Sequence, residues 1–479
     1  MKRKSLYIMS VALIGAMASL TGCGNQDNRT TIIYRSWDTG TETENNEERQ
    51  LIKAFEQKEN VRVIVVDNPG SNSTYQDGMD ASVVTGIDLA DVVMIRNLST
   101  SLKNRYLLDI KQYIENDPEF AKVPSAVRDA CKFKSGYYAI PARMNMKGYF
   151  VNTTIVKNKL GIDTTNLSVN SSYADIENII DTAATVADVV GLDSAAHFID
   201  TMASVLDNTE SRNLGYFTWS GDGYHLDSEP FVNGVKAGYE LFHSHKTLDA
   251  YSDEECEEMG IEAGNKTVDA WNKGKLALRW GATYEMKDMI ENKTLGNSYK
   301  FIGNPGGKIP VVGDYYGIYA GTQQPELAYK FAKWMSFGKE GFTKRMEIYK
   351  SSGSVNSLPL QNDPELINKY FDYYGDSTDM RGLDDAYEYI KTKSMVEGVK
   401  VVPGYQSSRF DAMTGVYITR IDPETQKEVQ VQLGMFDLLN YCIVGDLNIS
   451  NYTQGTININ TIANNEYTSW MNRYGKYYE

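Results

Sequence analysis

The sequence predicts an α/β protein of more than one domain, with parallel-rich sheets flanked by helices. The chain has 479 residues, 42% of them hydrophobic, and one hydrophobic core seldom serves more than about 250–300 residues. In the first hundred residues, short apolar and β-branched runs alternate with helical patterns, which favours a parallel sheet. A second pattern of the same kind begins near Gly148.

The first pattern opens with a strand expected at Thr31–Trp37 (TIIYRSW). A polar loop follows, in which Thr41 and Glu44 have the spacing of a capping box. After this loop the sequence predicts a helix. Its apolar face consists of Leu51, Ile52 and Phe55.

Two further strands complete the first pattern. The run Val61–Val66 (VRVIVV) is rich in apolar, β-branched residues, as is typical of a strand buried on both faces. Leu89–Ile95 (LADVVMI) predicts the third strand. Because these strands alternate with helices, ligand contacts are expected on the loops at their carboxyl ends.

Helical patterns recur later in the chain. Tyr173–Val190 predicts a long helix, and Pro325–Gly341 predicts another, with its proline in the first turn and Gly338 at its end. Trp334 lies on the apolar face of that second helix, so we expect it in the core. The tail Asn448–Tyr478 is rich in Asn, Thr and Tyr and has only weak periodicity.

The N-terminus has the pattern of an export signal. Lys2, Arg3 and Lys4 precede an apolar run over residues 6–20, which is too short for an ordinary membrane-spanning helix of about 20 residues. The run ends in Leu-Thr-Gly-Cys, similar to a bacterial lipobox, in which Cys23 would receive the lipid. We therefore expect a signal peptide at residues 1–22 and a tether at 23–29. An ordinary secretory signal with a chance cysteine is the alternative.

The composition of the chain limits the classes of partner that it can bind. The formal net charge is −15, and an acidic chain repels nucleic acid and anionic lipid. No later segment of the sequence is long and apolar enough to span a bilayer. Three cysteines besides Cys23 (Cys131, Cys256 and Cys442) match no metal or redox spacing. At most one disulfide can form among them, and free thiols of mixed burial are expected.

Motifs of the common enzyme classes are missing from the sequence. It has only four histidines, and no P-loop, dinucleotide fingerprint, Gly-x-Ser-x-Gly elbow or zincin spacing. We therefore expect no cofactor, no metal site and no catalysis. A glycosidase needs only two carboxylates, so a surface-anchored carbohydrate-active enzyme is the alternative function. An adhesin or scaffold is a third class.

Four segments in order resemble the extracellular solute-binding proteins of carbohydrate ABC importers, the group that includes the maltose-binding type. They are TIIYRSWDTG with the helix and strand that follow it, Gly136–Ile162 (GYYAIPARMNMKGYFVNTTIVKNKLGI), Asn272–Met286 (NKGKLALRWGATYEM) and Tyr315–Gly341. The resemblance covers roughly residues 30–360 well and the C-terminal hundred poorly. An adhesin or scaffold would lack these four ordered segments.

The resemblance implies a two-lobed periplasmic-binding-protein-like fold of type II, with a multi-strand hinge and a ligand cleft between the lobes. The chain would cross between lobes near Met146–Gly148, Tyr315–Gly317 and Ser354–Pro359. The N-lobe would consist of residues 30–146 and 317–358, and the C-lobe of 147–316 and 359–479. Binding would close the hinge, because only the closed form touches ligand with both lobes.

A sugar presents apolar C–H faces and a rim of hydroxyls, so its site needs aromatic rings and planar hydrogen-bonding groups. Trp37 and Asp38 follow the first strand, and Arg96 and Asn97 follow the third. The alternative for Asp38 is a capping or turn residue, and the alternative for Arg96 is a surface ion pair. Trp219 lies in a loop-like FTWSGDGY segment.

The resemblance adds further candidates. Arg143 and Asn145 adjoin the first crossover and either bridge the lobes or satisfy hinge backbone. Trp280 and Tyr284 match an aromatic sugar-stacking position, with Trp280 alternatively in the core. The remaining candidates are Tyr315 and Tyr316 at the second crossover, where at least one should line the cleft, and Phe410 at a late stacking position.

The partners implied are a carbohydrate, the permease subunits of an ABC transporter and, through Cys23, the membrane. The protein is expected to act as a monomer on the extracellular face of the cell membrane, with no nucleic-acid partner.

Overall fold

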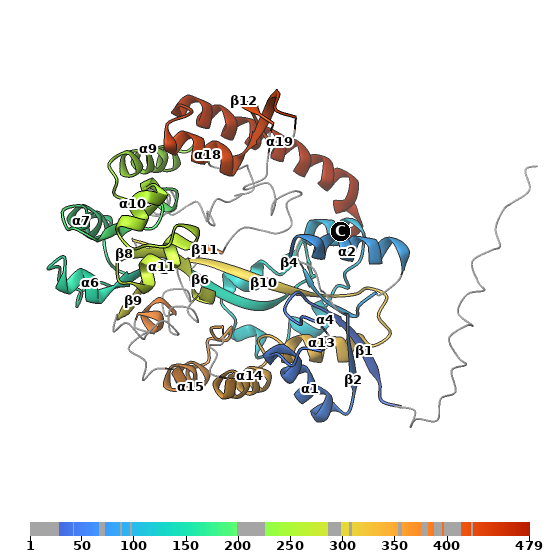
Figure 1. Ribbon diagram of the computed structural model, residues 1–479. Helices are drawn as coiled ribbons and strands as arrows, with labels where there is room; N and C mark the ends of the chain where they lie inside the picture. The colour runs from blue at the N-terminus through green and yellow to red at the C-terminus, as the bar shows by residue number, and fades with distance from the viewer. Residues whose placement is uncertain are drawn as a thin grey trace, which may run out of the picture.

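The computed structural model describes residues 28–41, 43–66, 72–86, 89–95, 98–198, 226–285, 298–305, 309–352, 357–374, 382–387, 395–396, 413–422 and 425–479. Within these ranges, nine strands form one mixed sheet in the order β2-β1-β3-β10-β6-β8-β7, with β11 beside β10 and β9 beside β6. Helices cover both faces of this sheet (Figure 1). The α/β prediction is therefore confirmed.

The strands of the large sheet are β1 (Thr31–Arg35), β2 (Arg62–Val66), β3 (Val92–Ile95), β6 (Ile140–Asn152), β7 (Val190–Leu192), β8 (Leu276–Ala282), β9 (Tyr299–Gly303), β10 (Pro310–Ile318) and β11 (Met395–Val396). Two hairpins lie apart from it. They are β4 (Lys132–Phe133) with β5 (Gly136–Tyr137), and β12 (Met413–Ile421) with β13 (Glu428–Gly434).

Among the described residues up to 198, the helices are α1 (Glu47–Glu59), α2 (Asn72–Thr85), α3 (Leu98–Lys103), α4 (Lys111–Ile114), α5 (Ser125–Asp129), α6 (Thr153–Asn158) and α7 (Tyr173–Ala183). Those that follow are α9 (Glu229–His243), α10 (Asp253–Glu258), α11 (Lys266–Asn272), α13 (Pro325–Trp334), α14 (Lys339–Ser352), α15 (Pro364–Tyr374), α18 (Met435–Val444) and α19 (Ile449–Tyr474). Short 3₁₀ turns include η4 (Thr283–Glu285) and η7 (Gly475–Tyr478).

The long strand β6 joins two halves of the sheet. Its first half, up to Met146, pairs with β10, whereas its second half, from Lys147, pairs with β8 and β9. We call the part of the molecule around β1, β2, β3 and β10 the N-lobe, and the part around β7, β8 and β9 the C-lobe. Because β10 pairs with β6 from Val311 onward, the chain has returned to the N-lobe by that residue.

Gly148 permits the close approach of two strands just beyond the middle of β6. A Cβ atom added at this position would lie 2.4 Å from the Cα atom of Gly303 in β9. No side chain fits in that space, so the sequence places glycine on both strands where the sheet passes from one lobe to the other.

The start of α1 differs from the expected capping box. Thr41 and Glu44 do interact, with the Thr41 N–H donating to Glu44 Oε1 at 2.9 Å, but they close a loop. The helix begins at Glu47, where the side chain of Asn46 accepts from the Arg49 N–H at 3.0 Å. The predicted apolar face is confirmed, since Leu51, Ile52 and Phe55 are buried.

The expectation that Val61–Val66 is buried on both faces is wrong. Strand β2 is the edge of the sheet, next to β1 alone, and Ile64 is 40% exposed. A run of β-branched residues is compatible with either position, because such residues suit any pleated, half-buried strand surface.

The two later helices are shorter than predicted. Helix α7 ends at Ala183, and Val190 begins strand β7. The predicted Pro325–Gly341 segment contains the whole of α13, which ends at Trp334, and the first residues of α14. Trp334 is buried as expected, and its indole N–H donates to the Leu51 carbonyl at 3.2 Å.

Two hydrophobic clusters organise the core. One fills the N-lobe and continues against the C-lobe residues Trp271, Tyr299 and Phe301. The other lies within the C-lobe and includes Trp280 and Tyr452. Cys131, Cys256 and Cys442 are free and all buried, so the expectation of mixed burial is wrong. No described helix is long and apolar enough to cross a membrane.

The C-terminal tail, for which the sequence showed only weak periodicity, contains the 26-residue helix α19. The Asn448 side chain caps it by accepting from the Asn451 N–H at 3.2 Å. Helices α18 and α19 lie on one side of the large sheet, whereas α13, α14 and α15 lie on the other (Figure 1).

Candidate functional site

The loop after β1 brings Trp37 and Asp38 to the carboxyl edge of the sheet. The Trp37 ring packs edge-on against Tyr75, with 5.1 Å between ring centroids. The Asp38 N–H donates to Ser36 Oγ at 3.2 Å, and the Asn46 side chain donates to the Asp38 carbonyl at 3.1 Å. These bonds fix the backbone of the loop, so the Asp38 carboxylate has a defined position.

A buried group of charges, which we call the N-lobe charge cluster, holds that carboxylate. It consists of Asp38, Glu48, Arg143 and Arg345. Arg143 Nη2 lies 2.9 Å from Glu48 Oε1 and 3.0 Å from Asp38 Oδ2. Arg345 donates to both Glu48 oxygens and, through Nη2, to the Met335 carbonyl at 2.8 Å. Arg143 therefore links a fully buried carboxylate to one at the sheet edge.

The two carboxylates of this cluster differ in their environment. Burial alone would raise the pKa of Glu48, but Arg345 and Arg143 outweigh it and lower the pKa below its ordinary value. Burial raises the pKa of Asp38 despite Arg143, and the nearby Glu48 and Asp314 carboxylates raise it further. Asp38 Oδ2 is itself buried against Arg143, but the Asp38 side chain as a whole is 25% exposed. The carboxylate group is therefore still accessible to a ligand.

Strands β6 and β10, which we call the hinge strands, place Asp314 beside this cluster, and β6 also contacts the C-lobe turn after β8. Asp314 of β10 lies opposite Arg143 in the register of the two hinge strands. Asn145 Oδ1 accepts from Thr283 Oγ1 at 3.3 Å, and the same hydroxyl accepts from the Met146 N–H at 3.0 Å. Tyr284 follows Thr283 in the turn after β8, and it is 61% exposed. An exposed aromatic ring thus adjoins the lobe junction, by which we mean the place where β6 passes from the N-lobe to the C-lobe.

A second polar group lies at the end of β8 in the C-lobe. Arg279 Nη2 pairs with Glu285 Oε2 at 2.6 Å. Burial raises the pKa of Glu285, against the opposing effect of Arg279. The buried Asp193 carboxylate accepts from the Trp280 N–H at 3.2 Å and lies 3.3 Å from His197 Nδ1. Arg279 and Glu285 lie in the same strand and turn as Tyr284, whereas Asp193 and His197 follow the neighbouring strand β7.

The structure distinguishes the two aromatic candidates of this segment. Trp280 is 6% exposed and packs against Tyr149 and His197. It belongs to the C-lobe core, which is the alternative that the sequence left open. Tyr284 is the one with a free ring face.

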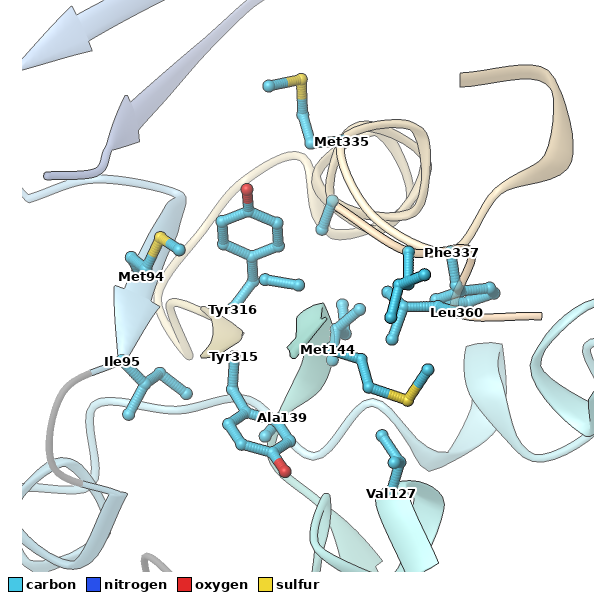
Figure 2. Packing of buried hydrophobic residues seen from close by; sticks show 14 of the residues in the cluster. Met94, Ile95, Val127, Ala139, Met144, Tyr315, Tyr316, Met335, Phe337 and Leu360 are labelled. Atoms are coloured by element: carbon cyan, nitrogen blue, oxygen red, sulfur yellow. The ribbon is translucent and has the colours of Figure 1, made fainter. Parts of the chain in front are cut away.

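The prediction that Tyr315 or Tyr316 lines the cleft needs correction. Both are packed in the N-lobe core, 3% and 0% exposed. Figure 2 shows their rings on opposite sides of β10, one toward Met335 and the other toward Ala139. Consecutive strand residues point to opposite faces, and both faces of β10 are covered here. The Tyr316 hydroxyl pairs with that of Tyr34 at 3.2 Å.

Four predicted site residues, Arg96, Asn97, Trp219 and Phe410, and the lipidation candidate Cys23 lie outside the described residues. Conversely, the sequence analysis missed Glu48, Arg345, Asp314 and Glu285. One feature of the sequence could have identified Glu48: it is an acidic residue in the first turn of α1, the helix that follows the Asp38 loop. The other three are charged residues whose partners are distant in sequence or in ordinary-looking turns.

Other features of the described residues point away from alternative sites. No group of three or more His, Cys, Asp or Glu residues in those ranges is arranged to hold a metal ion. Two surface hollows lie elsewhere. One, of about 400 Å³, is between α9 and the start of α19, and one, of about 530 Å³, is between α1 and α14. Neither contains a residue of the lobe junction.

The chain was compared with protein-family models, with curated protein sequences and with solved structures. A family model for bacterial extracellular solute-binding proteins matches residues 39–337. No curated protein sequence matches the chain.

Many solved structures share this fold. One is an ABC substrate-binding protein from Listeria monocytogenes in complex with cycloalternan, with 15% identity, a TM-score of 0.62 and coverage of 91% of this chain and 100% of that chain. Another is the sugar-binding protein MalE from Xanthomonas citri, with 12% identity, a TM-score of 0.63 and coverage of 92% and 99%.

A third is the galacto-N-biose-/lacto-N-biose I-binding protein from Bifidobacterium longum in complex with lacto-N-biose. It has 12% identity, a TM-score of 0.59 and coverage of 93% of this chain and 98% of that chain. At these identities the likeness concerns the fold. The two-lobed architecture expected from the sequence is therefore confirmed.

Proposed function

The chain belongs to the bacterial extracellular solute-binding protein family, and on that basis we propose that it binds a carbohydrate between its lobes and delivers it to an ABC transporter permease. The observation that carries the proposal is the family match over residues 39–337, which includes both sides of the lobe junction. Asp38 and Arg143 lie on one side of that junction, and Tyr284 lies on the other.

The chemistry of the junction suits a neutral, hydroxylated ligand. Asp38 offers a carboxylate that is 25% exposed, and the Tyr284 ring offers an apolar plate. Asn145 is buried and supports the site through its bond with Thr283. The N-lobe charge cluster is internally paired, so the site has little unbalanced charge to attract an ion. Solved structures of the same fold hold cycloalternan and lacto-N-biose, which supports an oligosaccharide as the ligand class.

A thermal-shift screen over mono- and oligosaccharides tests the proposal. A ligand at 100 times its dissociation constant adds about 2.7 kcal/mol to the free energy of unfolding. We therefore expect at least one oligosaccharide to raise the melting temperature measurably. The proposal fails if no sugar shifts it while a solute of another class does.

The alternative, a surface carbohydrate-active enzyme, is less well supported. The family and the similar structures are of solute-binding proteins, and we infer that this chain does not turn over its ligand. Incubation with the sugar found in the screen, followed by chromatography of the products, decides between the two. Saturable binding with no product favours the receptor, whereas release of shorter sugars favours the enzyme.

We further propose that binding closes the hinge. The sequence-based division assigns residues 30–146 and 317–358 to the N-lobe, and 147–316 and 359–479 to the C-lobe. The pairing of β10 favours a second boundary between Gly303 and Val311 instead. Small-angle scattering should give a smaller radius of gyration with saturating sugar than without. An unchanged radius would count against closure.

A lipid anchor at Cys23, with the protein on the extracellular face of the membrane, is the last part of the proposal. Its support is the lipobox-like sequence and the polar tether after it. We expect Cys23→Ser to release the protein from the membrane fraction without changing its affinity for sugar, because the tether precedes β1. A released variant with lost binding would show that the N-terminus belongs to the receptor itself.

A further inference from the structure

Helix α19 connects the two lobes through contacts at its two ends. It starts beside α18 and β12 in the C-lobe, and its last residues pack into the N-lobe core cluster. Its 26 residues, at about 1.5 Å rise each, make a rod of about 39 Å. The hinge strands link the lobes covalently, whereas the last residues of α19 contact the N-lobe by side-chain packing.

The first half of α19 is built into the C-lobe. Tyr452 and Ile459 are buried in the C-lobe cluster, and Thr456 is fully buried beside them. Asn458 Nδ2 donates to the Thr414 carbonyl of β12 at 2.7 Å. Asn460 Nδ2 donates to Asp227 Oδ1 at 3.2 Å. This half therefore moves with the C-lobe.

The middle of α19 is solvated. Between Thr461 and Ser469 the described side chains are exposed or half-buried, and Ile462 is 45% exposed. The half-buried Tyr467 is the residue of this stretch that packs against the C-lobe cluster among those the structure describes. The sequence there (TIANNEYTS) is polar around most of the helix. A helix of that character typically bridges between domains through solvent, which explains why the sequence pattern gave so weak a periodicity.

The last turn and the residues after it are seated on the N-lobe. Trp470 packs edge-on against Phe133 at 5.5 Å, and Tyr478 packs against both Phe133 and Tyr138 at 5.3 and 5.1 Å. The Tyr478 hydroxyl donates to the Leu102 carbonyl at 2.5 Å. Lys134 and Glu479 form an exposed ion pair at 3.0 Å. We call this contact, from Trp470 to Glu479, the C-terminal clasp.

We propose that α19 is a strut that limits how far the lobes separate in the absence of ligand. The proposal rests on the interlobe binding site proposed above. A rod of fixed length, built into one lobe and clasped to the other, holds the lobes at the spacing seen here. If the lobes separate further, the C-terminal clasp must break. The first half of α19 stays on the C-lobe, because buried side chains and hydrogen bonds both hold it there. Restricting the open ensemble raises the fraction of protein ready to bind.

The test compares a clasp variant, Trp470→Ala with Tyr478→Ala, against a matched control on the same helix, Ile457→Ala with Ile462→Ala. Both control residues are exposed. Spin labels at Gln57→Cys in α1 and Asn178→Cys in α7 report the distance between lobes, in full-length protein carrying Cys23→Ser. Phe133→Ala removes the N-lobe side of the clasp without changing α19, and circular dichroism checks that each variant is folded.

In ligand-free protein, we expect the clasp variant and Phe133→Ala to show a broader distribution of distances, extended toward longer values, with the control like the parent. With saturating oligosaccharide from the screen, all distributions should coincide, and the clasp variant should bind roughly 3- to 10-fold more weakly. Ligand-free distributions that match the parent, or that shift to shorter distances, would overturn the strut. If parent and variants alike bind no sugar, the proposed function fails, and the ligand-free distances still decide the strut.

Discussion

Replacing Glu48 with alanine is expected to lower the free energy of unfolding by about 3–5 kcal/mol, because it removes one partner from a buried ion pair. The Glu48 and Arg345 side chains are 5% and 4% exposed, and Arg345 would keep only the Met335 carbonyl as a described acceptor. Arg143 would lose its link to the helix α1 and retain Asp38. Denaturant unfolding followed by tryptophan fluorescence measures the change.

Glu47→Ala is the matched control, because Glu47 is also a glutamate and is next to Glu48 in the first turn of α1. Glu47 Oε1 accepts from the exposed Ser352 hydroxyl at 2.8 Å, so its loss should stay within about 0.5 kcal/mol. Similar effects from both substitutions would show that the buried position of Glu48 is not what matters.

The stability that Glu48 provides should depend on pH with a defined sign. Its pKa in the folded protein is lowered from the ordinary value of 4.5, so folding favours the ionised form. The contribution is fully present above pH 4.5 and is lost as the pH falls through the lower folded-state value. The stability difference between the parent and Glu48→Gln should therefore shrink below about pH 4.5. A difference that stays constant into acid would contradict the assigned ionisation.

The contrast between Asp38 and Glu48 shows what the sequence could and could not predict about the site. Asp38 directly follows a strand, and position at a strand end is visible in one dimension. The role of Glu48 depends on Arg143 and Arg345, which are 95 and 297 residues away along the chain. Only folding brings these three residues together, so no local pattern marks them.

The fold was predictable where local pattern and tertiary context agree, as in β1, β3 and α1. The fold was not predictable where contacts between elements distant in sequence determine whether a residue is buried. Tyr315 and Tyr316 match a family position at a hinge crossing, yet β10 is covered on both faces there and their rings are buried. Helix α19 has a polar middle because its two ends are stabilised by different lobes, and a search for one continuous apolar face finds little in it.

Tyr284→Ala is expected to weaken sugar binding by about 2 kcal/mol or more, within the range for buried aromatic anchors in an interface. The Tyr284 ring, which is 61% exposed, can cover the C–H face of a sugar and remove it from water. Asp38→Asn should have a smaller effect, because an amide keeps one acceptor while a charge-assisted bond is lost. Isothermal calorimetry with the oligosaccharide from the screen measures both.

The chain offers a matched control for the aromatic ring in Tyr417 of β12, which is 58% exposed and outside the lobe junction. Tyr417→Ala should bind sugar like the parent, so that the loss in Tyr284→Ala reports position and not merely the removal of an exposed tyrosine. Affinity should also change little with salt, because a neutral ligand brings no charge to be screened over the Debye length of about 8–10 Å. If Tyr284→Ala binds like the parent, or if affinity falls steeply with salt, the ligand is not a neutral sugar stacked on Tyr284.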